Sequence, residues 1–406
     1  MSESTTRRTS LWGQALVLSL GAAVSLGVTR FAYGLLLPPM RESLSWSYTL
    51  AGAMNTSNAA GYLVGALWMP RLLQRWRPGQ VLRAGMLLAS LFMALSGFVT
   101  DAWALMLQRF LAGWASALVF VTGGLLAAGL AQQRPQQGGW LIGLYYGGTG
   151  WGIVVSALMV PWVLLTPGEW PRAWWALAGV CTVALVALWR TVVGLDLQHS
   201  QTTAKPRQDE DIRFEVSRWV PGLAGYGCFG IGYIGYMTFV IALLREQGAS
   251  GSAITLFYAA LGLSVVVSAR LWARLLDHFK GGQALAILNA LLALATVVPA
   301  LAAPGWALAL SGLLFGAVFL SVVASTTAMV RHNLPASQWA RGISAFTIVF
   351  ALGQIIGPTL VGWVADGPGG LARGLACSAA VLVLGAVLAW RQRPLPHLTA
   401  GKTAVD

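Results

Sequence analysis

Two arginines interrupt long apolar segments that are otherwise free of charge. Arg30 lies in GVTRFAYGLLLPPM (27–40), and Arg109 lies in WALMLQRFLAG (103–113). A guanidinium in such surroundings needs a partner, and its planar fork matches both oxygens of a carboxylate or phosphate. All thirteen acidic residues and all four histidines lie outside these apolar segments. This distribution predicts that a small organic anion binds there, with Arg30 as the main binding residue and Arg109 assisting.

Polar and aromatic residues at helical spacing would complete such a site. Tyr33 follows Arg30 by three positions and is expected on the same helix face. Tyr226 and Tyr233 are seven positions apart and therefore also share a face, with Tyr236 close by. The candidate substrate contacts are Arg30, Tyr33, Asn55, Asn58, Arg109, Tyr145, Tyr146, Tyr226, Tyr233, Tyr236 and Gln354.

Structural roles compete with substrate binding at each of these positions. Arg109 would serve equally well as a structural residue that donates to backbone carbonyls, and Arg30 as a contact that changes between conformations. Buried amides and hydroxyls such as those of Asn55 and Gln354 often join neighbouring helices in membranes. Most of the 19 tryptophans are interpreted as anchors at the membrane surface.

Motifs typical of enzymes and metal sites are absent from the sequence. The segment AGKT (400–403) lacks the first glycine of a phosphate-binding loop, and neither HExxH nor GxSxG occurs. The three cysteines lie in separate apolar segments without the spacing of metal ligands. We therefore expect no catalytic residues, no metal and no cofactor.

The elements that must position these residues are membrane-spanning helices. Apolar residues make up 57% of the 406 positions and charged residues only 10%, against about 25% charged in soluble domains. This composition excludes a soluble enzyme, a disordered protein and a nucleic-acid binder, despite the net charge of +13. Runs of about 20 apolar residues predict twelve spans. They cover 12–37, 48–69, 81–100, 103–130, 140–165, 171–189, 219–243, 253–272, 283–302, 306–330, 342–365 and 373–390.

A polar insert divides these spans into two groups of six. The predicted domains are an N-terminal six-helix bundle (1–189), a cytoplasmic linker (190–218) and a C-terminal six-helix bundle with a short tail (219–406). Lys and Arg are retained on the cytoplasmic side of a membrane. Twenty of the 26 fall on the side of the two termini and four on the other, so both termini are expected in the cytoplasm.

The two halves repeat one another at a shift of 203 to 204 residues. LWMPRLLQRWR (67–77) returns as LWARLLDHFK (271–280), and WALMLQRFLAG (103–113) returns as WALALSGLLFG (306–316). Duplicated halves imply a pseudo-twofold axis along the membrane normal, with a substrate site between them near the midplane. Small residues and a proline would permit the close approach and bending that a rocking transporter needs. These are Gly147, Gly150, Gly353, Gly357 and Pro358.

The layout resembles the major facilitator superfamily over essentially the whole chain. Arg274, Asp277 and Lys280 look like a degraded copy of its cytoplasmic gate motif, whereas Arg71, Arg75 and Arg77 keep only the basic part, with Gln74 in place of the acid. Arg109 to Gly113 is similar to the RxxxG pattern of its fourth span, and GVTRFAYGLLLPPM resembles the first span of the bacterial YbfB/YjiJ-like branch. The resemblance implies a central cavity lined by spans 1, 4, 7 and 10, which would place both arginines on it.

These observations predict an all-α integral membrane transporter of the major facilitator fold, not an enzyme. We expect it to move a small carboxylate-type anion across a bacterial inner membrane by alternating access, by proton-linked symport or by exchange. The partners are then the lipid bilayer, the anion and protons, with no nucleic acid, and a single chain is expected to function as a monomer. One alternative is an efflux pump for bulky apolar, neutral or anionic compounds. Another is a non-transporting membrane sensor or a lipid-acting enzyme.

Overall fold

The structure is a computed structural model that describes residues 10–164, 170–199, 215–302, 304–335 and 338–395. All regular secondary structure among these residues is helical. The first half comprises α1 (Leu11–Ala22), η1 (Ala23–Phe31), α2 (Tyr33–Leu44), α3 (Tyr48–Leu73), α4 (Pro78–Ser96), α5 (Ala102–Gln133), η2 (Pro135–Gln137), α6 (Gly138–Val163) and α7 (Trp170–His199). The second half comprises η3 (Val216–Trp219), α8 (Val220–Glu246), α9 (Gly251–Leu271), α10 (Ala273–His278), α11 (Gln283–Ala300), α12 (Gly305–Asn333), α13 (Trp339–Ala365) and α14 (Gly370–Trp390).

Short polar side chains begin several of the long helices. Ser47 accepts a hydrogen bond from the Leu50 amide at the start of α3, and Asp101 accepts one from the Ala104 amide at the start of α5. Such caps satisfy amides that have no partner within the helix. Asp101 is therefore a capping residue at a helix end.

Eleven helices in the described part of the chain are long and apolar enough to cross a membrane. Here α1, η1 and α2 form one continuous span over Leu11–Leu44. The one predicted span missing from these eleven is 48–69, which is α3. This helix has 26 residues but carries the polar run Asn55–Thr56–Ser57–Asn58. These polar groups are used inside the protein, since Ser57 donates to the Met106 carbonyl and Thr56 to the Ile355 carbonyl. The predicted all-α membrane fold of twelve spans is confirmed.

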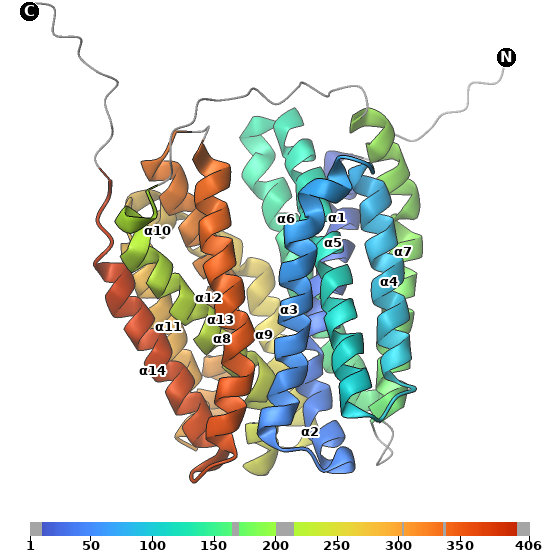
Figure 1. Cartoon of the computed structure of the whole chain (residues 1–406), viewed down its shortest axis with the longest axis vertical. Coiled ribbons are helices and arrows are strands. Elements are labelled where there is room, and N and C mark those ends of the chain that lie inside the picture. The colour runs from blue at the N-terminus through green and yellow to red at the C-terminus, as the bar shows by residue number, and fades with distance from the viewer. Residues whose placement is uncertain (1–9, 165–169, 200–214, 303, 336–337, 396–406) are drawn as a thin grey trace, which may run out of the picture.

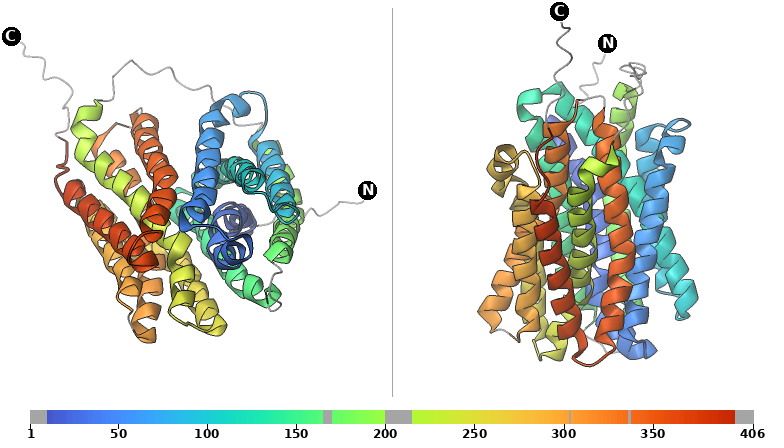
Figure 2. Two further views of the ribbon diagram at one scale, coloured as in Figure 1. Left: turned by 60° about the horizontal axis from the view of Figure 1, so that its bottom comes forward. Right: turned by 60° about the vertical axis from the view of Figure 1, so that its left-hand side comes forward.

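The helices form two groups that follow the two halves of the sequence (Figure 1). Figure 2 shows α1 to α7, coloured blue to green, beside α8 to α14, coloured yellow-green to red. We name the face at which α1 begins and α14 ends the terminal face, and the other the opposite face. Helix α7 continues to His199, so residues 190–199 of the predicted linker are helical. Residues 200–214 lie outside the described part of the chain.

The two halves meet along a seam formed by α2, α3 and α6 on one side and α8, α9 and α13 on the other. A side chain on Gly52 would collide with the Pro358 carbonyl, and one on Gly150 with the Gly262 carbonyl. Gly147 also faces α9, at Val266. The small residues at these positions therefore let the halves touch through their backbones.

The other glycines expected to aid bending lie elsewhere. Gly353 and Gly357 pack against the backbone of α8, at Gly227 and Ile231, within the second half. They bring two helices of the second half close together. Pro358, which follows them, is the member of this group that lies at the seam.

Candidate functional site

A π-helix in the first span positions Arg30. The segment η1 (Ala23–Phe31) follows the wider π-helical hydrogen-bond pattern, and eight of its nine residues are buried. The Thr29 hydroxyl donates to the Val24 carbonyl five positions earlier, and the Ser25 hydroxyl donates to the Ser116 carbonyl of α5. Stretches of π-helix are uncommon and concentrate at functional sites. Arg30 is the penultimate residue of this segment.

The Arg30 side chain is buried but has free hydrogen-bond donors. It is 2% exposed, and its Cζ atom lies 6.0 Å from the centre of the Tyr62 ring. Its Nε and Nη2 atoms have no hydrogen-bond partner among the described residues. These two atoms lie on the same edge of a guanidinium, where their N–H bonds are parallel and match the two oxygens of one carboxylate.

Tyrosines from both halves surround Arg30. Its charge interacts electrostatically with the hydroxyls of Tyr62 on α3 and Tyr233 on α8. The Gln354 amide of α13 donates to the Tyr233 oxygen at 2.6 Å. Because that oxygen already accepts one hydrogen bond, the hydroxyl hydrogen of Tyr233 is free to donate to another acceptor. Arg30, Tyr62, Tyr233 and Gln354 therefore form one group at the meeting of the halves, which we name the Arg30 site.

A stack of aromatic rings backs the Arg30 site in the second half. Tyr233 lies nearly parallel to Phe319, at 8° with centroids 6.0 Å apart, and stacks on Phe229 at 4.7 Å. Phe350 stacks on Tyr233 and Phe229 at 5.6 Å and 5.3 Å. Tyr226 continues the same stack, at 5.5 Å from Phe229. Rings this close fix the position of the Tyr233 hydroxyl.

Arg109 has a different environment, enclosed within the first half. Its Nη2 donates to the Thr29 carbonyl at 2.7 Å, and its Nη1 lies 3.8 Å from the Met93 sulfur. Its Cζ lies 5.1 Å from the Trp174 ring and 5.5 Å from the Tyr33 ring. The side chain is 1% exposed, and these contacts come from η1, α2, α4 and α7. Arg109 therefore holds the π-helix that carries Arg30.

Tyr33 does not lie on the same helix face as Arg30, contrary to the prediction. Its hydroxyl donates to the Ala51 carbonyl at 2.8 Å, and its ring lies beside Arg109. The prediction assumed α-helical spacing, in which positions three apart share a face. The π-helix turns less per residue, so Arg30 and Tyr33 point in different directions.

The remaining predicted contacts divide between the seam and the interior of each half. The Asn55 amide donates across the seam to the Thr238 hydroxyl at 2.7 Å. Tyr146 is 38% exposed and packs against Phe120, which also contacts the Tyr62 ring. The other three join helices of one half: Asn58 donates to the Arg109 carbonyl, Tyr145 to the Phe120 carbonyl, and Tyr236 shares a hydrogen bond with Ser311.

The residues expected to act in gating lie near the terminal face. Arg71 and Arg75 are exposed at the end of α3 and just beyond it. Arg274 and Asp277 are exposed on the short helix α10. These positions are compatible with contacts that form and break as the halves move.

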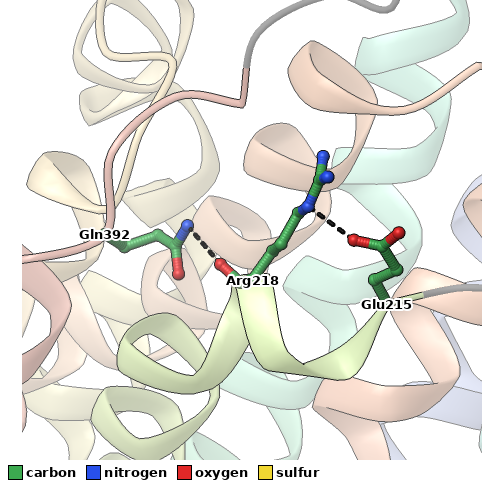
Figure 3. A network of polar contacts seen from close by, with 3 residues as sticks. All are labelled: Glu215, Arg218 and Gln392. Atoms are coloured by element: carbon green, nitrogen blue, oxygen red, sulfur yellow. Dashed lines mark hydrogen bonds and ion pairs between the residues drawn. The ribbon is translucent and has the colours of Figure 1, made fainter.

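An ion pair among the described residues lies near the terminal face, away from the Arg30 site. The Arg218 Nε lies 2.5 Å from a Glu215 oxygen, and Gln392 donates to the Arg218 carbonyl (Figure 3). This group ties the start of α8 to the residues after α14. No group of three or more His, Cys, Asp or Glu that could hold a metal occurs within the described ranges.

Sequence reasoning missed Tyr62, although a signal for it was present. Asn55, Asn58 and Tyr62 follow positions i, i+3 and i+7, so they lie along one face of α3. Phe229 likewise falls between Tyr226 and Tyr233 on one face of α8. The contributions of Phe319, Phe350 and Trp174 depend on packing between distant helices and have no local signal.

Two six-helix groups that meet around a buried guanidinium define a membrane transporter of the major facilitator type. More particularly, residues 22–390 match the family described as "Uncharacterised MFS-type transporter YbfB", and the chain belongs to that family. The predicted resemblance is thereby confirmed. Membership of a transporter family also bears out the prediction that the protein is not an enzyme.

Known proteins agree with this assignment. The chain is 24% identical over 351 residues to the "Inner membrane transport protein YdhP" of Escherichia coli strain K12, covering 85% of this chain and 88% of that protein. The crystal structure of the nucleoside transporter NupG superposes with a TM-score of 0.72 at 14% identity, covering 94% of this chain and 98% of that one. A D-xylose-proton symporter gives a TM-score of 0.71 at 15% identity, covering 94% and 97%. At these identities the two structures establish the shared fold alone.

Proposed function

We propose that this transporter moves a small organic anion of the carboxylate type across an inner membrane by alternating access. The observation that carries the proposal is the pair of buried, unpartnered donors on one edge of Arg30. A carboxylate would accept two parallel hydrogen bonds there and neutralise the charge. The inner membrane is inferred from the name of the relative YdhP, and the terminal face is taken as cytoplasmic from the distribution of Lys and Arg.

Energetics favour an anion over an empty site. A central arginine costs about 3 kcal/mol on insertion scales, and each buried donor left without an acceptor costs about 1–3 kcal/mol. No carboxylate among the described residues lies within ion-pair distance of Arg30. A bound anion therefore removes a cost that the protein alone does not remove.

Contacts join the halves on both sides of the Arg30 site. Toward the opposite face, Thr56 donates to the Ile355 carbonyl, Asn55 to Thr238, and Tyr258 to the Phe31 carbonyl. Near the terminal face, the Arg270 guanidinium of α9 packs on the Trp140 ring of α6. Rocking of the halves would open these two sets of contacts in turn and expose the Arg30 site to one side of the membrane and then the other. Proton-linked transport and anion exchange both fit this geometry.

Uptake into proteoliposomes by the purified full-length protein tests the proposal. We expect labelled carboxylates to be transported by the wild type, and Arg30→Gln to reduce uptake at least about tenfold, since losing a charged hydrogen-bond partner costs roughly 1.5–3 kcal/mol. Arg30→Lys should retain part of the activity because it keeps the charge but not the fork. Arg190→Gln, at an exposed position, is the matched control. Equal competition by neutral amides and carboxylates would contradict the proposal.

An efflux pump for bulky apolar compounds is the second candidate. The observation that favours it is the set of partly exposed aromatic side chains near Arg30, namely Tyr62, Phe120, Tyr146 and Phe350. Export of a neutral apolar compound that does not depend on Arg30 would favour this function over anion transport.

A further inference from the structure

We infer that the transported anion carries a single carboxylate on a flat, apolar body, such as an aromatic monocarboxylate. This inference rests on the proposed function and names the substrate class of the Arg30 site. Two observations carry it: the number of free positive charges at the site, and the chemistry of the side chains around them.

The charge at the site balances one negative charge. Arg30 and Arg109 are the charged side chains that lie deep within helices among the described residues. Arg109 donates through Nη2 to the Thr29 carbonyl and lies near the rings of Trp174 and Tyr33, and its Nε is a single donor without a partner. Of these two described arginines, Arg30 is the one that presents a pair of unpartnered donors on one edge, and this pair fits one carboxylate. A second carboxylate on the substrate would be desolvated without a partner, which is costly.

The surroundings of Arg30 favour an apolar, planar body. On the side of the first half, the Tyr62 ring lies 6.0 Å from the guanidinium, and Phe120 lies 6.5 Å from Tyr62 and 5.4 Å from Tyr146. On the side of the second half, Tyr233 lies within electrostatic range of the Arg30 charge, and Phe229 and Phe350 stack on its ring. A body attached to a carboxylate on Arg30 would therefore lie between aromatic side chains of both halves, where flat rings pack well.

Hydrogen-bonding groups around the site are partly used by the protein. The amide nitrogens of Asn55, Asn58 and Gln354 each donate to one partner, namely Thr238, the Arg109 carbonyl and Tyr233, while the Asn55 oxygen has no partner among the described residues. These groups do not match the many hydroxyl groups of a sugar or nucleoside, and each hydroxyl left without a partner in a buried site carries a cost. The free hydroxyl hydrogen of Tyr233 is instead placed to assist Arg30 at a single anionic group.

Binding of a matched series of naphthalenes to the purified full-length protein tests the inference, with calorimetry as the measurement. We expect 2-naphthoate to bind at least about tenfold more tightly than acetate, than 2-naphthamide and than naphthalene-2,6-dicarboxylate, since each change removes or opposes an interaction worth about 1.4 kcal/mol or more. Tighter or equal binding of the dicarboxylate, or of succinate, overturns the single-charge inference and leaves anion transport standing. Equal binding of acetate overturns the apolar body. Equal binding of 2-naphthamide, or binding of no carboxylate at all, overturns the inference and the proposed function together.

Substitution at Tyr62 tests the contact with the apolar body of the substrate separately from the contact with its charge. Tyr62→Leu should weaken 2-naphthoate at least about fivefold more than it weakens acetate, whereas Tyr62→Phe should retain binding of both because the ring remains. Trp162→Leu is the matched control, since Trp162 is 72% exposed on α6. If Tyr62→Leu weakens acetate as much as 2-naphthoate, the ring does not contact the apolar body and the inference fails.

Discussion

At the scale of single residues, the two arginines buried within apolar helices differ in their surroundings. Arg109 donates to the Thr29 carbonyl and lies beside two aromatic rings. Arg30 has two donors without partners and one ring at 6.0 Å, whereas Arg109 has one such donor, its Nε. The contacts of Arg109 offset more of the cost of burying its charge, whereas Arg30 keeps a pair of donors available to a ligand. Stability and function should therefore respond differently to the same substitution at each position.

Replacement by methionine, which keeps length but removes charge, is expected to separate these roles. Arg30→Met should raise the apparent Tm in detergent and abolish carboxylate binding, because it removes a buried charge that costs about 3 kcal/mol. Arg109→Met should lower the apparent Tm by several degrees, because the buried Thr29 carbonyl loses its donor at a cost of about 1–3 kcal/mol. Thermal unfolding with and without carboxylate measures both. A lower Tm for Arg30→Met would show that Arg30 is held by interactions of the protein itself.

The hydroxyl of Tyr233 provides a second test at this scale. Tyr233→Phe should weaken carboxylate binding by roughly three- to tenfold, since a hydrogen bond contributes about 0.5–1.5 kcal/mol. Gln354→Leu should have a smaller effect in the same direction, because Gln354 orients Tyr233 without reaching the anion. Titration calorimetry of both variants measures the difference. A neutral amide of the same shape is the control ligand, and equal losses for amide and carboxylate would assign Tyr233 to packing alone.

At the scale of elements, the π-helix η1 is the feature that organises the site. Its carbonyls accept hydrogen bonds from three side chains on two other helices: Ser25 accepts from Ser116 on α5, Thr29 from Arg109 on α5, and Phe31 from Tyr258 on α9. The last of these crosses the seam at 2.8 Å and joins the end of the π-helix to the second half. The direction of Arg30 is therefore linked to the contact between the halves.

Loss of the Tyr258 hydroxyl should loosen this segment. Tyr258→Phe removes the hydroxyl that donates to the buried Phe31 carbonyl, so we expect faster hydrogen–deuterium exchange in residues 23–31 and weaker carboxylate binding. Tyr236→Phe is the matched control, because Tyr236 is equally buried but its hydroxyl partner, Ser311, lies within the second half. Exchange in residues 23–31 that is the same in both variants would refute a link between Tyr258 and the π-helix.

The same element marks the limit of what the sequence could predict. Apolar run lengths located the spans, and the charge census isolated Arg30 and Arg109, because both follow from the cost of burying charge. The hydrophobic pattern of a span does not reveal whether its helix is of the α or the π type. The sequence therefore predicted Tyr33 beside Arg30, whereas its ring lies beside Arg109. The neighbours of Arg109, such as Trp174 and Met93, are brought together only by the packing of distant helices.

At the scale of the whole molecule, two carboxylates lie at the seam near the opposite face. Asp366, just after α13, accepts hydrogen bonds from the amides of Tyr48 and Thr49 and from the Thr49 hydroxyl. The Tyr48 hydroxyl donates to Glu246, and Arg41 lies 3.8 Å from the Tyr48 ring. Asp366 and Glu246 of the second half thereby hold the start of α3 in the first half, and we name these contacts the seam latch.

Protonation of Asp366 weakens the latch only at acidic pH. Partial burial raises the pKa of Asp366, but the hydrogen bonds from Thr49 and Tyr48 and the charge of Arg41 outweigh it, so the net pKa lies below its usual value. A carboxylate with a lowered pKa stabilises the latched state above its unlatched pKa of about 3.9 and loses this contribution as the pH falls through the lower, latched value. Near neutral pH Asp366 therefore remains ionised, and a coupled proton would have to travel elsewhere, for example on the carboxylate substrate itself.

Spin labels at Thr100 and Gly367, both exposed near the opposite face, can report the state of the latch. Asp366→Asn should increase the population with separated labels several-fold, because the amide accepts fewer and weaker hydrogen bonds from α3. The wild-type distance distribution should not change between about pH 5.5 and 8, since Asp366 is ionised throughout that range. The pH profile of uptake should likewise keep its shape in Asp366→Asn while the rate changes, because the pH dependence then belongs to the substrate. A shifted or flattened pH profile in this variant would instead identify Asp366 as the residue that carries the coupled proton, so that proton coupling would depend on the seam latch and not on the substrate.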